Sequence, residues 1–269
     1  MDAYSLAILG NALLSVFALG LMLDPIGLFG DDDDDDDDDT TTIIDDEDQT
    51  VTLTEGDDTF TGGSGADTVF AAEGDDQVAG EAGDDVLYGG DGDDLLEGGT
   101  GDDAIEGNLG DDILLGGDGD DALVGGSGTD TLVGGAGDDV LTSDRLDEDA
   151  AFNRGEAESL SGGDGDDILI LSTGDTATGG EGTDQFGVVV VGGEDPATIE
   201  DFDTETEVLA LYYDPADYDD EEPELTLSID EDANQTLLSL NGQQVVTLNG
   251  VQDLNIEDVA LLTEDTLTG

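Results

Sequence analysis

GGSGADTVF, residues Gly62 to Phe70, is the clearest of ten consecutive nine-residue units that run from Leu53 to Thr142 without an insertion or deletion. The units follow, with variations, the pattern G-G-x-G-x-D-x-U-x, in which U is apolar. A fixed short period is typical of architectures in which each unit stacks on its neighbours instead of building a globular core. The period predicts an all-β fold, a parallel β-roll over residues 53–187.

Each position of the unit has an expected role. We expect positions one to six to form a turn, because glycines at positions one, two and four permit positive φ and close backbone approach. Positions seven to nine should form a short strand in which only position eight points inward. Two units then make one coil, and each turn lies beneath the turn eighteen residues later. The expected inward residues are Phe60, Val69, Val78, Leu87, Leu96, Ile105, Leu114, Leu123, Leu132 and Leu141.

The sixth position is Asp in every unit of the block, and two later units, Gly162 to Ile170 and Gly179 to Gly187, repeat the pattern. Stacking divides these aspartates into a first file, which starts at Asp58, and a second file, which starts at Asp67. Hard oxygen ligands of this kind suit calcium, and the spacing of about 4.8 Å between coils fits ions held between neighbouring turns. We therefore predict multiple Ca²⁺ ions, roughly eight in the unbroken block at six oxygens per ion. The predicted ligands are Asp58, Asp67, Asp76, Asp85, Asp94, Asp103, Asp112, Asp121, Asp130, Asp139, Asp167 and Asp184.

The composition excludes several other functions. The formal net charge is -72, with 74 acidic residues against two arginines, Arg145 and Arg154. Such a charge repels nucleic acid and anionic lipid, and it favours cations as partners. The chain has no Cys, His or Lys, so zinc sites and the common nucleophile and base pairs are excluded. We therefore expect a protein that is not an enzyme.

The N-terminal part differs from the repeats. Residues 1–30 form a hydrophobic segment, and Ala3 to Leu23 contain no charged residue, which predicts a helix long enough to span a bilayer core of about 30 Å. Membrane anchoring through residues 3–23 is the favoured interpretation; a signal sequence and a hydrophobic packing segment are alternatives. Residues 31–52 include nine consecutive aspartates and are interpreted as an extended acidic linker.

The repeat is interrupted at residues 143–161, either by an excursion loop or by two decayed turns. Leu171 to Thr178 is a degenerate unit of eight residues without an aspartate in the sixth place. Residues 188–269 contain short apolar stretches, expected to be strands, at 188–191, 208–212, 225–229, 236–240 and 245–248. Asn241-Gly242 predicts a hairpin turn, and we interpret this region as a C-terminal β cap.

Two further expectations concern stability and surface. One large inward side chain per nine residues is a thin core, and stacked carboxylates repel one another, so we predict that the block unfolds without calcium. Several outward positions are nevertheless apolar, which reflects either strand propensity or an interface with a protein partner or a second copy of the chain. These outward residues are Phe70, Val86, Tyr88, Val124 and Val140 on one sheet, and Leu95, Ile113, Leu115 and Val133 on the other.

The nonapeptides resemble those of the repeats-in-toxin (RTX) family of secreted bacterial proteins, in which a parallel β-roll carries calcium in its turns. Ala197 to Leu211 (ATIEDFDTETEVLAL) and Val245 to Leu261 resemble the C-terminal module of serralysin-like proteases. The resemblance implies an extracellular or cell-surface location and an uncleaved C-terminal signal for type I secretion. The protease domain and its zinc histidines have no counterpart here.

Together these features predict a secreted or surface-displayed calcium-binding protein with a structural or interaction role. Two alternatives are a non-catalytic remnant or C-terminal module of a calcium-dependent hydrolase or lyase, and a surface adhesin.

Overall fold

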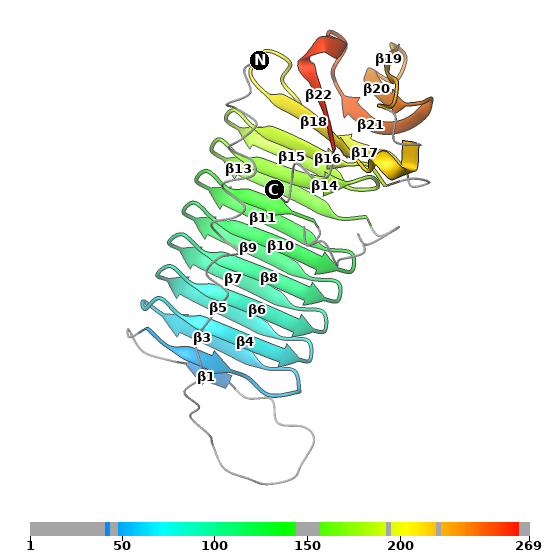
Figure 1. Ribbon diagram of the computed structural model, residues 1–269. Coiled ribbons are helices and arrows are strands. Elements are labelled where there is room, and N and C mark those ends of the chain that lie inside the picture. The colour runs from blue at the N-terminus through cyan, green and yellow to red at the C-terminus, as the bar shows by residue number, and fades with distance from the viewer. Residues whose placement is uncertain (1–40, 44–47, 144–156, 192–194, 219–221, 264–269) are drawn as a thin grey trace.

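The computed structural model describes residues 41–43, 48–143, 157–191, 195–218 and 222–263. In these ranges the chain winds into a β-solenoid whose coils stack from β1 at one end to β22 at the other (Figure 1). One sheet has twelve strands in the order β1-β3-β5-β7-β9-β11-β13-β15-β17-β21-β20-β19, and the other has ten in the order β2-β4-β6-β8-β10-β12-β14-β16-β18-β22. Alternate strands therefore belong to opposite sheets, as a roll of two units per coil requires.

Within the repeat block every pairing is parallel. The pair Leu114 and Leu132 is typical, because residues eighteen apart face each other across the ladder. The twelve-stranded sheet takes β3 (Thr59–Gly63), β5 (Gln77–Ala82), β7 (Leu95–Thr100), β9 (Ile113–Asp118) and β11 (Thr131–Ala136). The ten-stranded sheet takes β4 (Thr68–Glu73), β6 (Val86–Asp91), β8 (Ala104–Leu109), β10 (Ala122–Ser127) and β12 (Val140–Thr142).

The strands are longer than the sequence pattern predicted. A typical strand has six residues and runs from position seven of one unit to position three of the next, so only positions four to six remain for the turn. Positive φ occurs at positions two and four, as at Gly90 (φ 128°) and Gly92 (φ 138°), but not at the position-one glycines. The expectation of positive φ within the turn at position one was therefore wrong: this position lies within a strand and faces inward, as the buried Ala71 does. The expected close backbone approach is present, because a Cβ at Gly89 would lie 2.6 Å from the carbonyl oxygen of Gly107.

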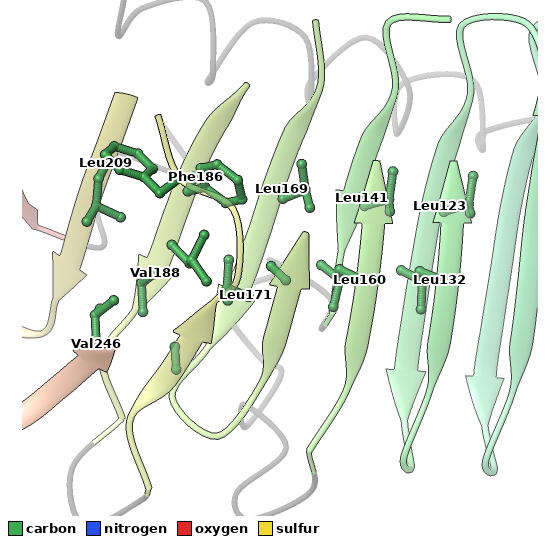
Figure 2. Close-up of a cluster of buried hydrophobic side chains, with 14 of the residues drawn as sticks. Leu123, Leu132, Leu141, Leu160, Leu169, Leu171, Phe186, Val188, Leu209 and Val246 are labelled. Carbon is green, nitrogen blue, oxygen red and sulfur yellow. The ribbon is translucent and has the colours of Figure 1, made fainter. Parts of the chain in front are cut away.

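The core is a thin layer of side chains between the two sheets, with one row from each sheet. Every predicted position-eight residue from Phe60 to Leu141 is at most 3% exposed. Figure 2 shows Leu123, Leu141 and Leu169 of one sheet in one row, and Leu132 and Leu160 of the other sheet in the facing row. These residues form one apolar cluster that continues into the C-terminal strands.

The roll begins before Leu53. Strand β2 (Thr50–Thr52) pairs in parallel with β4, and β1 (Thr41–Ile43) pairs with β3, each at the eighteen-residue offset. Part of the expected acidic linker thus belongs to the sheets. The nine aspartates at 31–39 and the apolar segment 3–23 lie outside the described residues.

The interruption contains one decayed unit and ten additional residues. Strand β13 (Ser159–Asp164) pairs with β11, and Leu160 takes position eight opposite Leu132. In the other sheet, the hydrogen bond from Asp139 to Asp167 spans 28 residues instead of eighteen. Neither sequence interpretation was therefore complete. Strands β14 (Ile168–Ser172), β15 (Thr176–Glu181) and β16 (Gln185–Val189) then restore the regular alternation.

The C-terminal strands extend both sheets. Strands β17 (Ala197–Ile199) and β18 (Val208–Tyr213) add another coil, and β22 (Val259–Thr263) pairs in parallel with β18. Strands β19 (Leu225–Asp230), β20 (Gln235–Leu240) and β21 (Gln243–Asn249) form an antiparallel meander. The hairpin prediction is confirmed, since Asn241 and Gly242 both have positive φ between β20 and β21. The segments Pro215–Tyr218 (η1) and Ile256–Asp258 (η2) are short 3-10 helices.

Across the described ranges, no helix is long and apolar enough to span a bilayer. The helix expected at residues 3–23 falls outside these ranges.

Candidate metal centre

The sixth-position aspartates form two buried files, one along each edge of the roll. All twelve predicted ligands are at most 3% exposed. From Asp76 to Asp139, Oδ1 of each aspartate accepts a hydrogen bond from the backbone N–H of the file member one coil earlier, as in Asp94 N–H to Asp112 Oδ1 at 2.8 Å. A hydrogen bond of the same kind, from Asp139 N–H to Asp167 Oδ1, continues the second file across the interruption. The backbone thus holds each carboxylate in one orientation.

The second carboxylate oxygen has a different environment. In nine aspartates Oδ2 is buried and has no hydrogen-bond partner within the described structure. A buried carboxylate oxygen without a partner is costly, because the charge has lost water and gained nothing in return. The oxygens therefore require a proton or a cation. These nine residues are Asp67, Asp76, Asp85, Asp94, Asp103, Asp112, Asp121, Asp139 and Asp167.

The raised pKa values of several file aspartates reflect the same cost of burying a carboxylate. Burial, with a smaller contribution from the carboxylates of Asp130 and Asp94, raises the pKa of Asp112 to about 8, against the opposing hydrogen bond from the Asp94 N–H. Burial likewise raises the pKa of Asp94, Asp103 and Asp139 to about 7. Such shifts mean that the ionised files are unfavourable without a counter-charge.

Wherever position one is glycine, the carboxylate Oδ2 of the same unit approaches the glycine so closely that a side chain would not fit. A methyl group on Gly89 would collide with Asp94 Oδ2 and lie 2.6 Å from the carbonyl oxygen of Gly107 in the next coil. We call this close approach of oxygens around a position-one glycine a cradle. Ten position-one glycines form one: Gly62, Gly80, Gly89, Gly98, Gly107, Gly116, Gly125, Gly134, Gly162 and Gly179.

The oxygens around the cradles are of the kind that a hard cation binds. In all ten, a carboxylate Oδ2 lies next to the position-one glycine, and in seven a backbone carbonyl oxygen of the next coil lies 2.6 or 2.8 Å from where a Cβ would be. Calcium takes six to eight such oxygens at about 2.3–2.6 Å. Within the described ranges, no three acidic side chains gather into a metal-binding group. Seven of the cradles therefore combine one carboxylate with a main-chain oxygen of the next coil.

Position five carries a second ladder that the sequence reasoning missed. These aspartates are exposed, and their Oδ1 accepts the N–H of the position-five residue one coil later, as in Asp111 N–H to Asp93 Oδ1 at 2.9 Å. The direction is opposite to that of the buried files. The sequence did contain a signal for this ladder, because eight of the ten units in the block have Asp at position five. Only Ala66 and Thr129 differ.

Two members of the first file were also missed. Glu158 precedes β13 as Asp130 precedes β11, and it is 3% exposed. Asp175 is fully buried, and its Oδ1 accepts the Glu158 N–H at 3.2 Å, so the short unit 171–178 does supply an acid to the file. A nine-residue unit that ends just before Gly162 has Glu158 at its sixth position, so the spacing could have identified this residue. Asp175 could have been identified because, like the other file aspartates, it comes directly before the last three residues of its unit, here Thr-Ala-Thr.

The second file ends among acidic residues of the last coil. Glu207 precedes β18 as Asp184 precedes β16, and burial raises its pKa to about 7, with Asp184, Asp201 and Asp203 adding to the shift. Asp201 accepts the N–H groups of Gly179 and Gly180 at 2.9 and 3.0 Å. The last cradle, at Gly179, is thus bordered by side chains from the C-terminal region.

The outward apolar residues are unevenly covered. Phe70, Leu95 and Ile113 are 40%, 37% and 45% exposed, and Phe70 stacks on Tyr88 with ring centroids 5.0 Å apart. Val124, in contrast, is only 6% exposed. The outward rows are therefore not one continuous solvent-exposed surface.

Comparison with known proteins identifies the repeats. Overlapping matches to the RTX calcium-binding nonapeptide repeat family together cover residues 45–141. No curated protein matches the chain. The matched range coincides with the stacked turns and their aspartate files, and calcium is the ion that such repeats bind. Over this range the sequence matches the RTX calcium-binding nonapeptide repeat, and the structure there is a parallel β-roll.

Proposed function

We propose that the buried aspartate files bind calcium in the cradles and that the roll folds as the ions bind. The observation that carries this proposal is the set of nine buried Oδ2 atoms without a hydrogen-bond partner. A row of such oxygens is unstable at neutral pH unless a cation compensates the charge. Calcium supplies that compensation when bound.

The chain's own residues prepare the sites. The N–H of the preceding coil fixes Oδ1 and so orients Oδ2 toward the cradle. Glycine at position one lets the carboxylate Oδ2 approach the backbone, where an added Cβ would collide with it. Each ion would then join two stacked turns, so binding at one turn favours order in the next.

We propose a structural or interaction role without catalysis. The absence of Cys, His and Lys from the sequence supports this, because the common nucleophiles and bases are missing. The exposed Phe70, stacked on the half-buried Tyr88, and the exposed Leu95 and Ile113 give the roll two apolar areas for a protein partner.

An extracellular or cell-surface location follows from the same chemistry. Many weak carboxylate and carbonyl sites suit the high calcium concentrations outside cells, where modules bind with dissociation constants of about 10⁻⁴–10⁻³ M. The resemblance of residues 197–211 to a secretion module supports type I export. Membrane anchoring through residues 3–23 remains part of the proposal.

A matched pair of substitutions tests the calcium sites. Asp112→Asn removes a buried carboxylate beside a cradle, whereas Asp111→Asn neutralises its exposed neighbour, which only accepts a backbone N–H. Far-ultraviolet circular dichroism during a calcium titration should show β structure appearing with calcium. We expect Asp112→Asn to raise the midpoint roughly tenfold or more and Asp111→Asn to leave it almost unchanged. Equal midpoints for both variants, or full β structure in excess chelator, would contradict the proposal.

A further inference from the structure

The outward face of the ten-stranded sheet is buried toward the C-terminal end of the roll, whereas the outward face of the other sheet is not. Two isoleucines show the difference, because both take position seven of their unit. Ile113, in β9 of the twelve-stranded sheet, is 45% exposed, and Ile168, in β14 of the ten-stranded sheet, is 7% exposed. Residue type and repeat position are the same, so the difference lies in what covers each sheet.

The buried outward residues form an apolar cluster of their own, in which no side chain is more than 7% exposed. Along the strands this cluster alternates with the inner core, to which Leu169 and Leu209 belong. Successive side chains of a strand point to opposite faces, so the cluster lies on the outside of the roll. We call it the outer cluster. Its members are Ile168, Ile170, Val189, Ala210 and Tyr212.

Packing within the sheet does not explain this burial. The ring of Tyr212 lies over Gly187 of the neighbouring strand, with Cε2 3.1 Å from the point that a Cβ would take there. Tyr212 is itself only 2% exposed. Within the described ranges, the half-buried apolar residues that pack against the outer cluster belong to the same sheet, so they do not cover its outward face. The structure contains one chain, and a further segment of that chain must therefore lie over the outer cluster.

We propose that the apolar segment Ala3 to Leu23 packs along the outer cluster when no bilayer is present. The inference goes beyond the calcium function and concerns the residues of the proposed membrane anchor. The segment has 21 residues without a charge, and as a helix it would be about 31 Å long. The strands from β10, where Val124 is 6% exposed, to β22 span about 24 Å at about 4.8 Å per strand. The segment is therefore long enough to cover the face.

The chain before β1 can bring the segment to this face. Residues 24–40 connect Leu23 to the first coil, and these 17 residues reach about 58 Å when fully extended. Strand β17, in the coil of β18, lies eight strand spacings from β1, which is about 38 Å. The aspartates at 31–39 repel one another, and that repulsion favours an extended connection. The acidic linker is therefore sufficient as a tether.

The other candidate covers fit the outer cluster less well. Residues 144–156 follow β12 closely in sequence, but seven of these 13 residues are charged, and burying charge against an apolar cluster is costly. Their two arginines would suit Glu106, which is 9% exposed at the β8 end of the face, better than they suit the cluster itself. A second copy of the chain is disfavoured because each copy has a formal net charge of -72.

Cysteine accessibility tests the proposal, because the chain has no cysteine of its own. Ile168→Cys places a thiol in the outer cluster, and Ile113→Cys is the matched control on the other sheet. In calcium and without lipid, we expect a maleimide to modify the Ile168→Cys chain roughly tenfold or more slowly than the Ile113→Cys chain, because reaction requires local opening of the cover. After deletion of residues 3–23 the two rates should become similar. Circular dichroism in calcium verifies that each variant is folded.

A full-length variant keeps the test valid if the deletion impairs folding. Leu13→Asp combined with Phe17→Asp places two charges one helical turn apart in the segment, which should release it from the apolar face. The thiol of the Ile168→Cys chain should then react as fast as it does after the deletion. Leu13→Met combined with Phe17→Leu keeps the segment apolar and should leave the protection unchanged.

Three results would overturn the proposal. Equal rates for Ile168→Cys and Ile113→Cys in the full chain would show that the outer cluster is not covered. Protection that survives both the deletion and the two aspartate substitutions would assign the cover to another segment, such as residues 144–156. Protection that disappears on dilution would assign it to a second copy. All three leave the calcium function untouched, whereas full β structure in excess chelator would contradict that function and not this inference.

Discussion

The repeat block and the C-terminal region bury apolar side chains at very different densities. In β9 only Leu114 among the large apolar residues is fully buried, with exposed or half-buried neighbours on both sides. In β18 five successive residues, from Leu209 to Tyr213, are buried, and in β21 four are. A region that buries several apolar residues per strand can be stable by itself, whereas a single inward row leaves the roll dependent on its turns.

The charge distribution follows the same division. The turns of the roll hold buried carboxylates whose second oxygen has no partner. In the C-terminal meander the buried polar group Thr236 instead donates its hydroxyl to the carbonyl oxygen of Val251 at 2.8 Å. In the meander this buried polar group is paired within the protein, whereas in the roll the buried carboxylate oxygens are available to a metal ion.

Calcium removal should therefore separate the two regions, and this is the largest effect we expect. In excess chelator the amides of β4 to β11 should lose their protection from hydrogen exchange, because the carboxylate files then repel without compensation. The amides of β20 and β21 should retain measurable protection. Hydrogen exchange with mass-spectrometric readout measures both in one sample. Simultaneous loss of protection in both regions would show that they fold as one unit.

Acidification should partly replace calcium in the roll. The folded pKa values of Asp76, Asp94 and Asp112 lie above the ordinary value of 3.8, at about 6, 7 and 8 respectively. The folded state therefore binds more protons than the unfolded chain between about pH 4 and pH 8, and its stability falls as the pH rises through that range. Calcium-free protein should show more β structure by circular dichroism at pH 5 than at pH 8.

With calcium bound, the pH dependence of the roll should reverse. The metal requires ionised carboxylates, so protons compete with it and calcium affinity should fall on acidification. A calcium-free protein whose β content increases from pH 5 to pH 8 would contradict the assignment of these pKa shifts to the folded state.

Two core truncations should distinguish the regions on a smaller scale. Leu114→Ala and Leu238→Ala each remove a fully buried side chain, and each should cost about 2 to 5 kcal/mol. Leu114→Ala should also raise the calcium midpoint for folding, because folding of the roll and binding are coupled. Leu238→Ala should lower the denaturant midpoint of the meander and leave the calcium midpoint unchanged. Equal shifts of the calcium midpoint in both variants would remove the distinction between the regions.

Much of the roll could be predicted from sequence because its rules are local and repeated. The period, the inward position eight and the buried position six all follow from residue type at a fixed spacing, and each is seen from Phe60 to Leu141 and from Asp58 to Asp139. The hairpin at Asn241-Gly242 was predictable for the same reason, since few residues adopt positive φ at two successive positions.

The predictions failed where a role depends on a neighbouring coil. The inward direction of position one is not visible in the unit itself, because it depends on where the aspartate five residues later places its Oδ2 and where the next coil places a carbonyl. Glu158 and Asp175 were missed because an insertion and a deletion hide the spacing, while strand pairing restores the register in space.

The sequence by itself predicted the solenoid and the twelve regularly spaced aspartates of the files, because a nine-residue period leaves few ways to bury one apolar residue and one carboxylate per unit. Only the tertiary structure decided that Glu158 and Asp175 continue the first file, and which second carboxylate oxygens are already engaged. Thr54 donates to Oδ2 of Asp58 and Ser172 donates to Oδ2 of Asp175, and these contacts depend on the conformation of each turn, which a residue outside the repeat pattern or a deletion changes.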